Sequence, residues 1–472
     1  MVKSKRMHLV YMAVFIVLLI ALTALLSACG ETVVPGEDAI TVPDDFSTIQ
    51  EAIDAVGEGA TIVVRPGVYM ENIDFKGKNI TLRSENPDDP AVVAETIING
   101  GRMNSVVSFS NGESQGAVLS GFTITGGSGN LETLAFEGEG QIREESALFG
   151  GGIIVLNGSS PTITKNVIVN NVAVRGGGIF IHQSSPAITD NIVSDNTSEG
   201  GGGGIFIAES HVTITGNVIT NNLASRSGGG LAISGDSDSP SVVDNNDISG
   251  NRAENGGGFF VFESNLGITN NSITGNTASQ NGGGFFLVSS SPEITGNNIT
   301  DNIAVVTGGG ISANRVSSPI ISGNVIVGNR ADAGGGISIY VNSSPIVEDN
   351  TIVDNRASNG GGLVIAEGST PTLSGNDIEE NRAERNGAGI FVFASSPTIT
   401  GNTLRNNEAR RNGGGIVAEE NSTLVINNNV FTNNRAREGG SVHLSGGSVL
   451  QLSSPDDNIH EGNLPDDIFT AQ

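Results

Sequence analysis

The amino-acid sequence predicts an all-β fold, a single-stranded parallel β-helix in which each coil of about 26 residues supplies three short strands. The composition has 67 glycines, no tryptophan and 37% apolar residues, which is unlike an ordinary globule and too apolar for a disordered chain. A glycine triplet or its equivalent recurs twelve times, at steps of 26 residues apart from one of 28 and one of 27. Such a regular period is the signature of a stacked repeat protein. The triplets end at Gly152, Gly178, Gly204, Gly230, Gly258, Gly284, Gly310, Gly336, Gly362, Gly389, Gly415 and Ser441.

Three short apolar segments in each repeat are expected to be strands. The first follows the glycines, and its first and third residues are apolar, which indicates a strand with one buried face. The second is expected to bury residues from Ile163 through Val242 to Val425. The third lies between two asparagines and is expected to bury residues from Ile168 to Val430. No helical period separates the strands, so each coil pairs only with its neighbours and stacks its core on theirs.

The corners between the strands explain the remaining consensus residues. The glycines suit a turn that needs positive φ or a close approach of backbones. The asparagines form two columns, the first running from Asn166 through Asn245 to Asn428 and the second from Asn171 to Asn433. Stacked side-chain amides can hydrogen-bond from coil to coil, and asparagine tolerates the left-handed backbone of a tight bend.

The two ends depart from the repeat. Residues 46–56 are expected to form an N-terminal cap helix, in which Ser47 and Gln50 fit a capping box. One helical face then carries Phe46, Ile49, Ile53 and Val56. Residues 40–126 are expected to form this cap and irregular first coils, 127–149 an acidic insertion, 150–446 the twelve repeats, and 447–472 a C-terminal cap.

The N-terminal segment has the layout of an export signal. Lys3, Lys5 and Arg6 precede an apolar run that is short for a membrane-spanning helix. Residues 26–30, "LSACG", resemble the bacterial lipobox, whose cysteine is lipidated and becomes the mature N-terminus. We therefore expect a lipoprotein signal peptide over 1–28, lipidation of Cys29 and a tether over 29–39. The protein would be exported and anchored to the bacterial cell envelope by this lipid alone, facing outside the cytoplasm.

The charge balance excludes some partners. Removal of residues 1–28 would leave 20 basic and 50 acidic side chains, a net charge of −30. This excess of acid argues against nucleic acid and anionic lipid surfaces as partners. The oligomeric state does not follow from the sequence.

The segment at 45–82, "DFSTIQEAIDAVGEGATIVVRPGVYMENIDFKGKNITL", resembles the opening of right-handed β-helix proteins of the pectin lyase-like superfamily, pectin esterases included. The repeats "SSPTITKNVIVNN" and "GGGIFI" resemble bacterial right-handed β-helix repeat proteins, and "FTNNRAREGG" at 431–440 is similar to repeats of polymorphic outer membrane proteins. The resemblance implies a right-handed coil over about nine tenths of the chain. It implies no single activity, because the superfamily mixes lyases, hydrolases, esterases, epimerases and non-catalytic proteins.

No catalytic residue and no metal ligand are assigned from the sequence. Beyond the opening segment, no position matches the catalytic motifs of pectin esterases, and His182 and His211 are expected to be hydrogen-bonded or solvated rather than general bases. Scattered acids such as Asp190 and Asp301 are expected to be solvated turn residues, and Ca²⁺ remains the one cofactor considered.

Two features exceed what the scaffold needs. The first is an aromatic stripe at the second and fourth positions of the strand after the glycines, where polar residues are expected. Exposed rings there would suit a sugar or a protein partner, unless residues 127–149 or another chain cover them. The stripe consists of Phe180, Phe206, Phe260, Phe262, Phe286, Tyr340, Phe391 and Phe393.

The second feature is a column of arginines that follow the second asparagine column, with Arg330, Arg356 and Arg382 at its centre. Nearby acids favour an interleaved surface ion network, and the alternative is a groove for a polyanionic glycan. Together the two features favour a cell-surface protein that binds a polysaccharide or a cell-surface protein through its lateral face. The alternatives are a polysaccharide lyase or related carbohydrate-active enzyme, and a structural or adhesive rod.

Overall fold

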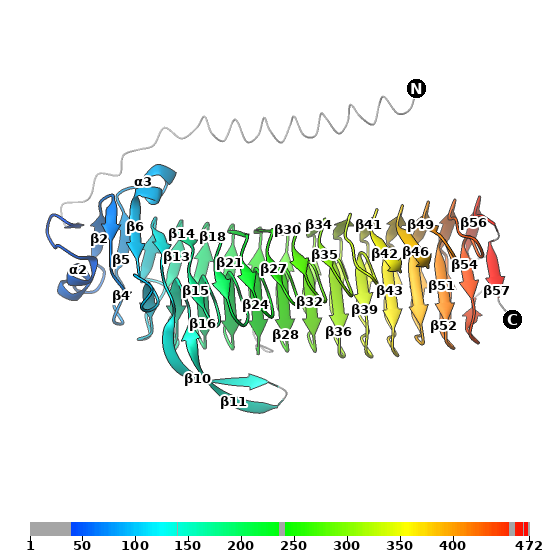
Figure 1. Cartoon of the computed structure of the whole chain (residues 1–472), viewed down its shortest axis with the longest axis horizontal. Helices are drawn as coiled ribbons and strands as arrows, with labels where there is room; N and C mark the ends of the chain where they lie inside the picture. Colours follow the sequence, from blue (N-terminus) through cyan, green and yellow to red (C-terminus); the bar gives the residue numbers. More distant parts are fainter. Residues whose placement is uncertain (1–38, 139, 236–240, 453–457, 466, 471–472) are drawn as a thin grey trace, which may run out of the picture. The chain divides into compact units, whose positions relative to one another are not determined.

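The structure is a computed structural model that describes residues 39–472 except 139, 236–240, 453–457, 466 and 471–472, and it is a parallel β-helix (Figure 1). In this described part, three parallel sheets of 16, 15 and 15 strands run along the axis, and nearly every coil adds one strand to each. We call them sheet A, sheet B and sheet C. Among the described residues no helix is long and apolar enough to cross a membrane.

Sheet A holds the second strand of each coil. Its strands, in spatial order, are β1 (Ile40–Val42), β2 (Thr61–Val64), β5 (Thr81–Ser84), β8 (Val118–Ser120), β13 (Thr162–Thr164), β17 (Ala187–Thr189), β21 (Thr213–Thr215), β25 (Val242–Asp244), β29 (Gly267–Thr269), β33 (Glu293–Thr295), β37 (Ile320–Ser322), β40 (Ile346–Glu348), β44 (Thr372–Ser374), β48 (Thr398–Thr400), β52 (Thr423–Asn427) and β55 (Val449–Gln451).

Sheet B holds the third strand, between the asparagines. Its strands are β3 (Gly67–Tyr69), β6 (Thr96–Asn99), β9 (Thr123–Thr125), β14 (Val167–Val169), β18 (Ile192–Ser194), β22 (Val218–Thr220), β26 (Asp247–Ser249), β30 (Ser272–Thr274), β34 (Asn298–Thr300), β38 (Val325–Val327), β41 (Thr351–Val353), β45 (Asp377–Glu379), β49 (Thr403–Arg405), β53 (Val430–Thr432) and β56 (Ile459–Glu461).

Sheet C holds the strand that follows the glycines. Its strands are β4 (Ile73–Asp74), β7 (Val107–Phe109), β12 (Ile153–Val155), β16 (Ile179–His182), β20 (Ile205–Ala208), β24 (Leu231–Ser234), β28 (Phe259–Phe262), β32 (Phe285–Val288), β36 (Ile311–Asn314), β39 (Ile337–Ile339), β43 (Leu363–Ala366), β47 (Ile390–Phe393), β51 (Ile416–Glu419), β54 (Val442–Leu444) and β57 (Ile468–Thr470).

The core consists of inward residues stacked in register, which confirms the predicted coil of three strands. In sheet C, for example, Phe259 pairs with Phe285, and their buried rings stack with centroids 4.6 Å apart. Three predicted core positions are wrong by one residue, because the sequence there offers neighbouring apolar residues. The buried side chains are Val243 rather than Val242, Leu424 and Ile426 rather than Val425, and Phe431 rather than Val430.

The asparagine columns are ladders of buried side chains. Asn297 is representative: its Nδ2 donates to the Ile268 carbonyl at 2.8 Å and to Asn324 Oδ1 at 3.1 Å. In three of the coils with consecutive asparagines the prediction took the residue before the ladder position, which adopts the left-handed backbone. The ladder residues are Asn246, Asn429 and Asn434, whereas Asn245, Asn428 and Asn433 have φ of 54° to 55°.

The glycine triplets make the closest contact between coils. Gly176 has a φ of 65°, which favours glycine. A Cβ added to Gly178 would lie 2.6 Å from the Gly204 carbonyl oxygen of the next coil. The first glycine is therefore required by backbone conformation and the third by lack of space.

The N-terminal end is covered by the predicted helix, α2 (Ile49–Ala55). Its N-cap is Thr48, which accepts from Glu51 N, so the predicted box of Ser47 and Gln50 is displaced by one residue. The Glu71 carboxylate also accepts from Ile49 N and Gln50 N at 3.0 and 2.9 Å. A second short helix that the sequence analysis did not predict, α3 (Pro90–Glu95), starts after Asp89.

A short fourth strand before the glycines was also not predicted. We call the residues between the second asparagine ladder and the glycine triplet the fourth-strand corner. Its strands are β15 (Val172–Ala173), β19 (Thr197–Ser198), β23 (Leu223–Ala224), β27 (Arg252–Ala253), β31 (Thr277–Ala278), β35 (Ile303–Ala304), β42 (Arg356–Asn359), β46 (Arg382–Asn386) and β50 (Glu408–Ala409). Residues 447–472, expected as a cap, add β55, β56 and β57 to the three sheets.

Candidate functional site

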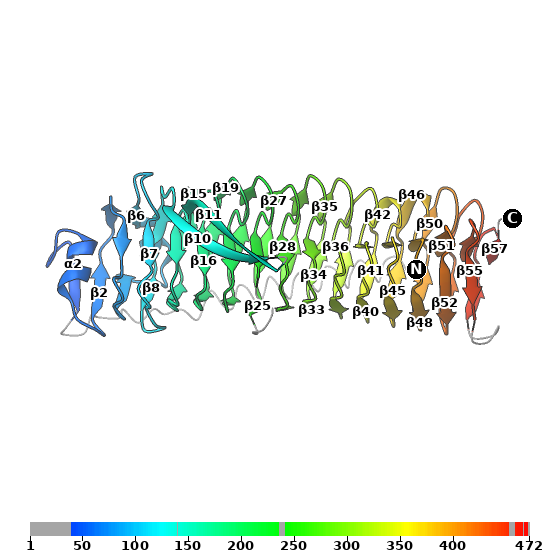
Figure 2. The ribbon, with the colours of Figure 1, turned by 90° about the horizontal axis from the view of Figure 1, so that it is seen from below.

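The acidic insertion forms an antiparallel hairpin, β10 (Asn130–Gly138) and β11 (Gln141–Phe149), that leaves the β-helix before β12. It lies across the outer side of sheet C from β16 to β28 (Figure 2). Alternation along its strands turns one face toward sheet C, and that face carries Leu134, Phe136 and Ala147. The segments "NLETLAFEG" and "QIREESALF" both alternate between apolar and polar residues, and this alternation could have predicted the two strands of the hairpin.

Apolar packing and hydrogen bonds hold the hairpin on the coils. The Phe136 ring lies 6.5 Å from the Phe180 ring and 5.2 Å from the His182 ring, centroid to centroid. His182 Nε2 lies 3.0 Å from the Ala135 carbonyl oxygen, which can only accept, so Nε2 carries the proton. Farther along, Glu137 N donates to Glu209 Oε1 at 2.7 Å. The expectation of a hydrogen-bonded His182 is confirmed.

Arg175, from the fourth-strand corner, joins the hairpin to the coils. Its guanidinium makes a bidentate pair with Glu145 of β11, at 3.1 and 2.5 Å. The same guanidinium carbon lies 5.0 Å from the ring centroids of Phe136 and Phe206. The cation is therefore placed between an aromatic ring of the hairpin and one of sheet C, and both contacts are attractive.

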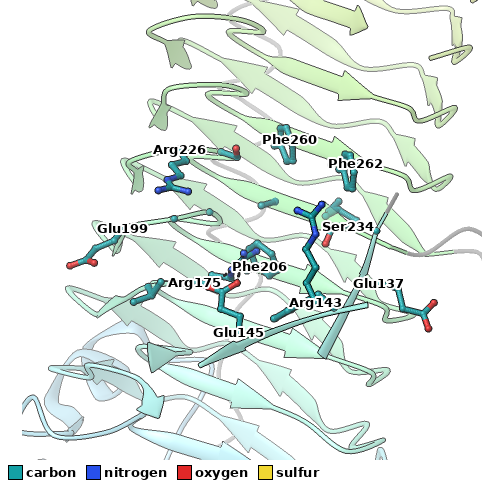
Figure 3. Close-up of a pocket in the computed structure, with 18 of the residues that line it drawn as sticks. Glu137, Arg143, Glu145, Arg175, Glu199, Phe206, Arg226, Ser234, Phe260 and Phe262 are labelled. Atoms are coloured by element: carbon teal, nitrogen blue, oxygen red, sulfur yellow. Dashed lines mark hydrogen bonds and ion pairs between the residues drawn. The ribbon is translucent and has the colours of Figure 1, made fainter. Parts of the chain in front are cut away.

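A groove of about 740 Å³ lies between the hairpin, sheet C and the fourth-strand corner (Figure 3). We call it the hairpin groove. The rings of Phe206, Phe260 and Phe262 line it on the sheet C side. Arg143 enters from the hairpin, and Arg226 lies on the opposite rim, above Glu199 in Figure 3. A volume of this size is typical of ligand sites.

The charges that line the hairpin groove nearly balance. Its titratable residues are Arg143, Arg175, Arg226, Glu137, Glu144, Glu145 and Glu199, three cations against four anions. Because Arg175 is paired with Glu145, the remaining lining charges do not sum to a positive field. The arrangement suits a ligand with hydroxyl groups and apolar ring faces better than a strongly charged polymer.

The predicted aromatic stripe is divided between two environments. Phe180, Phe206 and Phe391 are buried, so the alternative that the chain itself covers the stripe holds for these three residues. The physical reason is that the chain folds back over the second strand position at the fourth-strand corner: Gly201 lies against the Phe206 ring, and Ala333 packs against the cluster that contains Phe391. The hairpin completes the cover over Phe180.

The other predicted aromatic residues remain at least partly exposed. Phe260, Phe262 and Phe286 are half-buried, and the rings of Phe260 and Phe286 are 5.9 Å apart. Phe393 is 38% exposed and lies far along sheet C from the hairpin. The hairpin groove thus gathers only Phe206, Phe260 and Phe262 of the predicted stripe.

The predicted arginines lie elsewhere, on the fourth-strand corner of later coils. Arg330 pairs across the coils with Arg356, and Arg356 with Arg382. Only part of the expected ion network is present in the described residues, with Arg356 bound to Asp354 at 3.2 Å and Arg405 to Glu379 at 2.6 Å. The sequence analysis missed Arg143, Arg175 and Arg226 because they belong to no repeating column.

Two other predictions concern a lipid and a metal ion. Cys29, the predicted lipidation site, lies outside the described residues. In the described part of the chain no group of three or more His, Cys, Asp or Glu side chains could hold a metal ion, so Ca²⁺ remains only a prediction.

Comparison with known proteins shows similarity to a family, to a curated relative and to a solved structure. The family model described as right handed beta helix region matches residues 88–248, 204–378 and 335–454. A probable pectinesterase/pectinesterase inhibitor 17 from Arabidopsis thaliana is 32% identical over 110 residues, covering 21% of this chain and 21% of that protein. The chain thus spans about a fifth of that relative's length. A solved alginate lyase of family PL6, AlyGC, aligns with 92% of this chain and 80% of its own at a TM-score of 0.37 and 11% identity.

Proposed function

Because the chain belongs to the right-handed β-helix family, whose fold it shares with pectin lyase-like carbohydrate-active enzymes, we propose that it is an exported glycan-binding protein. The site is the hairpin groove. The observation that carries the proposal is the meeting of the half-buried rings of Phe260 and Phe262 with Arg143 and Arg226 in one groove. Aromatic rings pack against the C–H faces of sugars, and guanidinium groups donate to their hydroxyl oxygens.

The ligand we propose is a neutral or weakly charged polysaccharide. The acidic side chains in the groove, four against three arginines, would repel a densely anionic chain. The groove is bounded on its two sides by the hairpin and the fourth-strand corner, and both run along the coil axis (Figure 2). The two sides meet at the β12 end, where Val174 N donates to the Leu148 carbonyl oxygen at 2.8 Å and Arg175 pairs with Glu145, so a linear polymer would enter from the other end.

The test is a Phe260→Ala, Phe262→Ala double variant. Each ring is expected to contribute about 1.4 kcal/mol, or about tenfold in affinity, so the pair should cost about a hundredfold. Retention is measured by affinity electrophoresis in gels that contain a neutral glucan, xylan, mannan or a polyuronate. Phe393→Ala is the matched control, because Phe393 holds the same strand position as Phe262 without lining the groove.

Three outcomes contradict this proposal. If no polymer retains the wild-type chain, the groove is not a glycan site and a structural rod is favoured. If both variants bind equally, the aromatic residues are not the contact. If ultraviolet absorbance from unsaturated ends rises during incubation with a polyuronate, the protein is a polysaccharide lyase.

We propose also that a lipid on Cys29 anchors the protein to the envelope. Cys29→Ser should abolish incorporation of a labelled fatty acid and release the chain from the membrane fraction, because it removes the only thiol in the sequence. Equal labelling of the variant and the wild type would exclude Cys29 as the attachment site.

A further inference from the structure

Beyond the hairpin groove, we infer that the fourth-strand corner of the C-terminal coils is a second site, which binds a linear sulfated or carboxylated polysaccharide. Its residues form an arginine ladder in two adjacent columns. The first column holds Arg330, Arg356, Arg382, Glu408 and Arg435, paired in that order across successive coils. The second holds Arg385, Arg411 and Arg437, joined by backbone hydrogen bonds from Arg411 N to Arg385 O and from Arg437 N to Arg411 O.

The local charge is opposite to that of the chain. Across segments 330–333, 356–359, 382–386, 408–412 and 435–438, eight arginines stand against four acidic residues, a net charge of +4 by difference. The whole chain has a net charge of −27. The positive surface is therefore confined to one corner of the β-helix.

Most of these cations lack an internal counter-charge. Within the described residues, Arg356 pairs with Asp354 and Arg410 with Glu384, but no ion pair joins Arg330, Arg382, Arg385, Arg411, Arg435 or Arg437 to an acidic group. All six are exposed. Like charges on adjacent strands, about 4.8 Å apart, repel one another. An external polyanion would remove this repulsion.

The geometry favours a linear polymer over a membrane. The arginines follow one corner along the coil axis over five coils, from Arg330 to Arg435, rather than spreading over a flat face. Every basic residue in the ladder is arginine, whose planar guanidinium donates two hydrogen bonds to one carboxylate or sulfate. A chain of regularly spaced anionic groups matches this arrangement.

The test compares full-length variants on immobilised heparin and on a polyuronate, at about 50 mM and about 200 mM salt. Arg382→Gln with Arg411→Gln should lower affinity at least about tenfold at the lower salt and weaken its dependence on salt. Arg252→Gln is the matched control. Arg252 opens its corner strand as Arg382 does, but its neighbours across the coils are Leu223 and Thr277, so affinity should change less than about twofold.

A gain of binding provides a second measurement. Glu408→Gln removes the acid between Arg382 and Arg435 and should raise affinity several-fold, a result that misfolding cannot imitate. Phe260→Ala with Phe262→Ala should leave heparin binding unchanged, which separates this site from the hairpin groove. The proposal is overturned if neither polymer retains the wild type or if the double arginine variant binds as the wild type does. It is overturned equally if the arginines affect binding only to anionic vesicles, compared with neutral ones.

Discussion

We expect the Gly309→Ala variant to lose about 5 kcal/mol or more of stability. A Cβ on Gly309 would lie 2.5 Å from the backbone nitrogen and 2.6 Å from the carbonyl oxygen of Arg330, and closer still to the Gly335 carbonyl oxygen. All three atoms are backbone of the next coil and cannot rotate away. The coils must separate locally, which breaks the hydrogen bonds between them.

The measurement is chemical denaturation followed by circular dichroism, with hydrogen exchange to locate the loosened coils. Gly267→Ala is the control, because a Cβ there meets nothing within 4 Å. Its stability should change by less than about 0.5 kcal/mol. Similar losses in the two variants would show that lack of space between coils is not why the triplets are glycine.

The Asn297→Asp variant should lose about 3–5 kcal/mol. Asn297 is buried, and its Nδ2 donates to three acceptors, the carbonyl oxygens of Ile268 and Thr295 and the Oδ1 of Asn324. In the variant a carboxylate oxygen faces these three oxygens without a proton to share. The other carboxylate oxygen still accepts from Asn271 N and Nδ2, at 2.8 and 3.0 Å, but a buried charge that faces three acceptors without a donor between them is costly.

The control is Asn298→Asp, which adds the same charge at the exposed neighbouring residue and should change stability by less than about 0.5 kcal/mol. The pH dependence of stability distinguishes the two variants. The acceptors around the buried carboxyl raise its pKa in the folded state, so the folded state binds the extra proton and the deficit should shrink as pH falls. Urea denaturation at neutral and acidic pH checks this, and a deficit independent of pH would contradict it.

The fold could be predicted from the sequence because each repeat of the sequence forms one coil of the structure. A period of about 26 residues, with apolar residues in three segments, has one efficient packing, so the sheets and their register followed from it. The errors fell where the sequence was locally degenerate, as at Asn245 and Asn246. Either residue satisfies the pattern, and only the left-handed backbone of Asn245 places Asn246 in the ladder.

The candidate site was harder to predict because it arises where the repeat is broken. The segment 127–149 occurs only once in the sequence, so its conformation cannot be inferred from a matching segment in the next coil. Arg175 belongs to a repeated coil and Glu145 to the hairpin, so the sequence repeat gives no indication of their contact. The sequence left the exposure of the aromatic residues open, because the fourth-strand corner, which packs against Phe206 and Phe391, has too few apolar residues to be recognised as a strand.

The hairpin has a mechanical consequence. In a coil stack each turn adheres only to the turns beside it, so a pull along the axis would separate the weakest pair. The hairpin touches four successive coils, through His182, Glu209, Gly235 and Phe262. The hairpin bridges these four coils, so they should resist extension together. If the β-helix is pulled along its axis, the coils that the hairpin does not touch should separate first, and the hairpin groove should keep its shape while they do so.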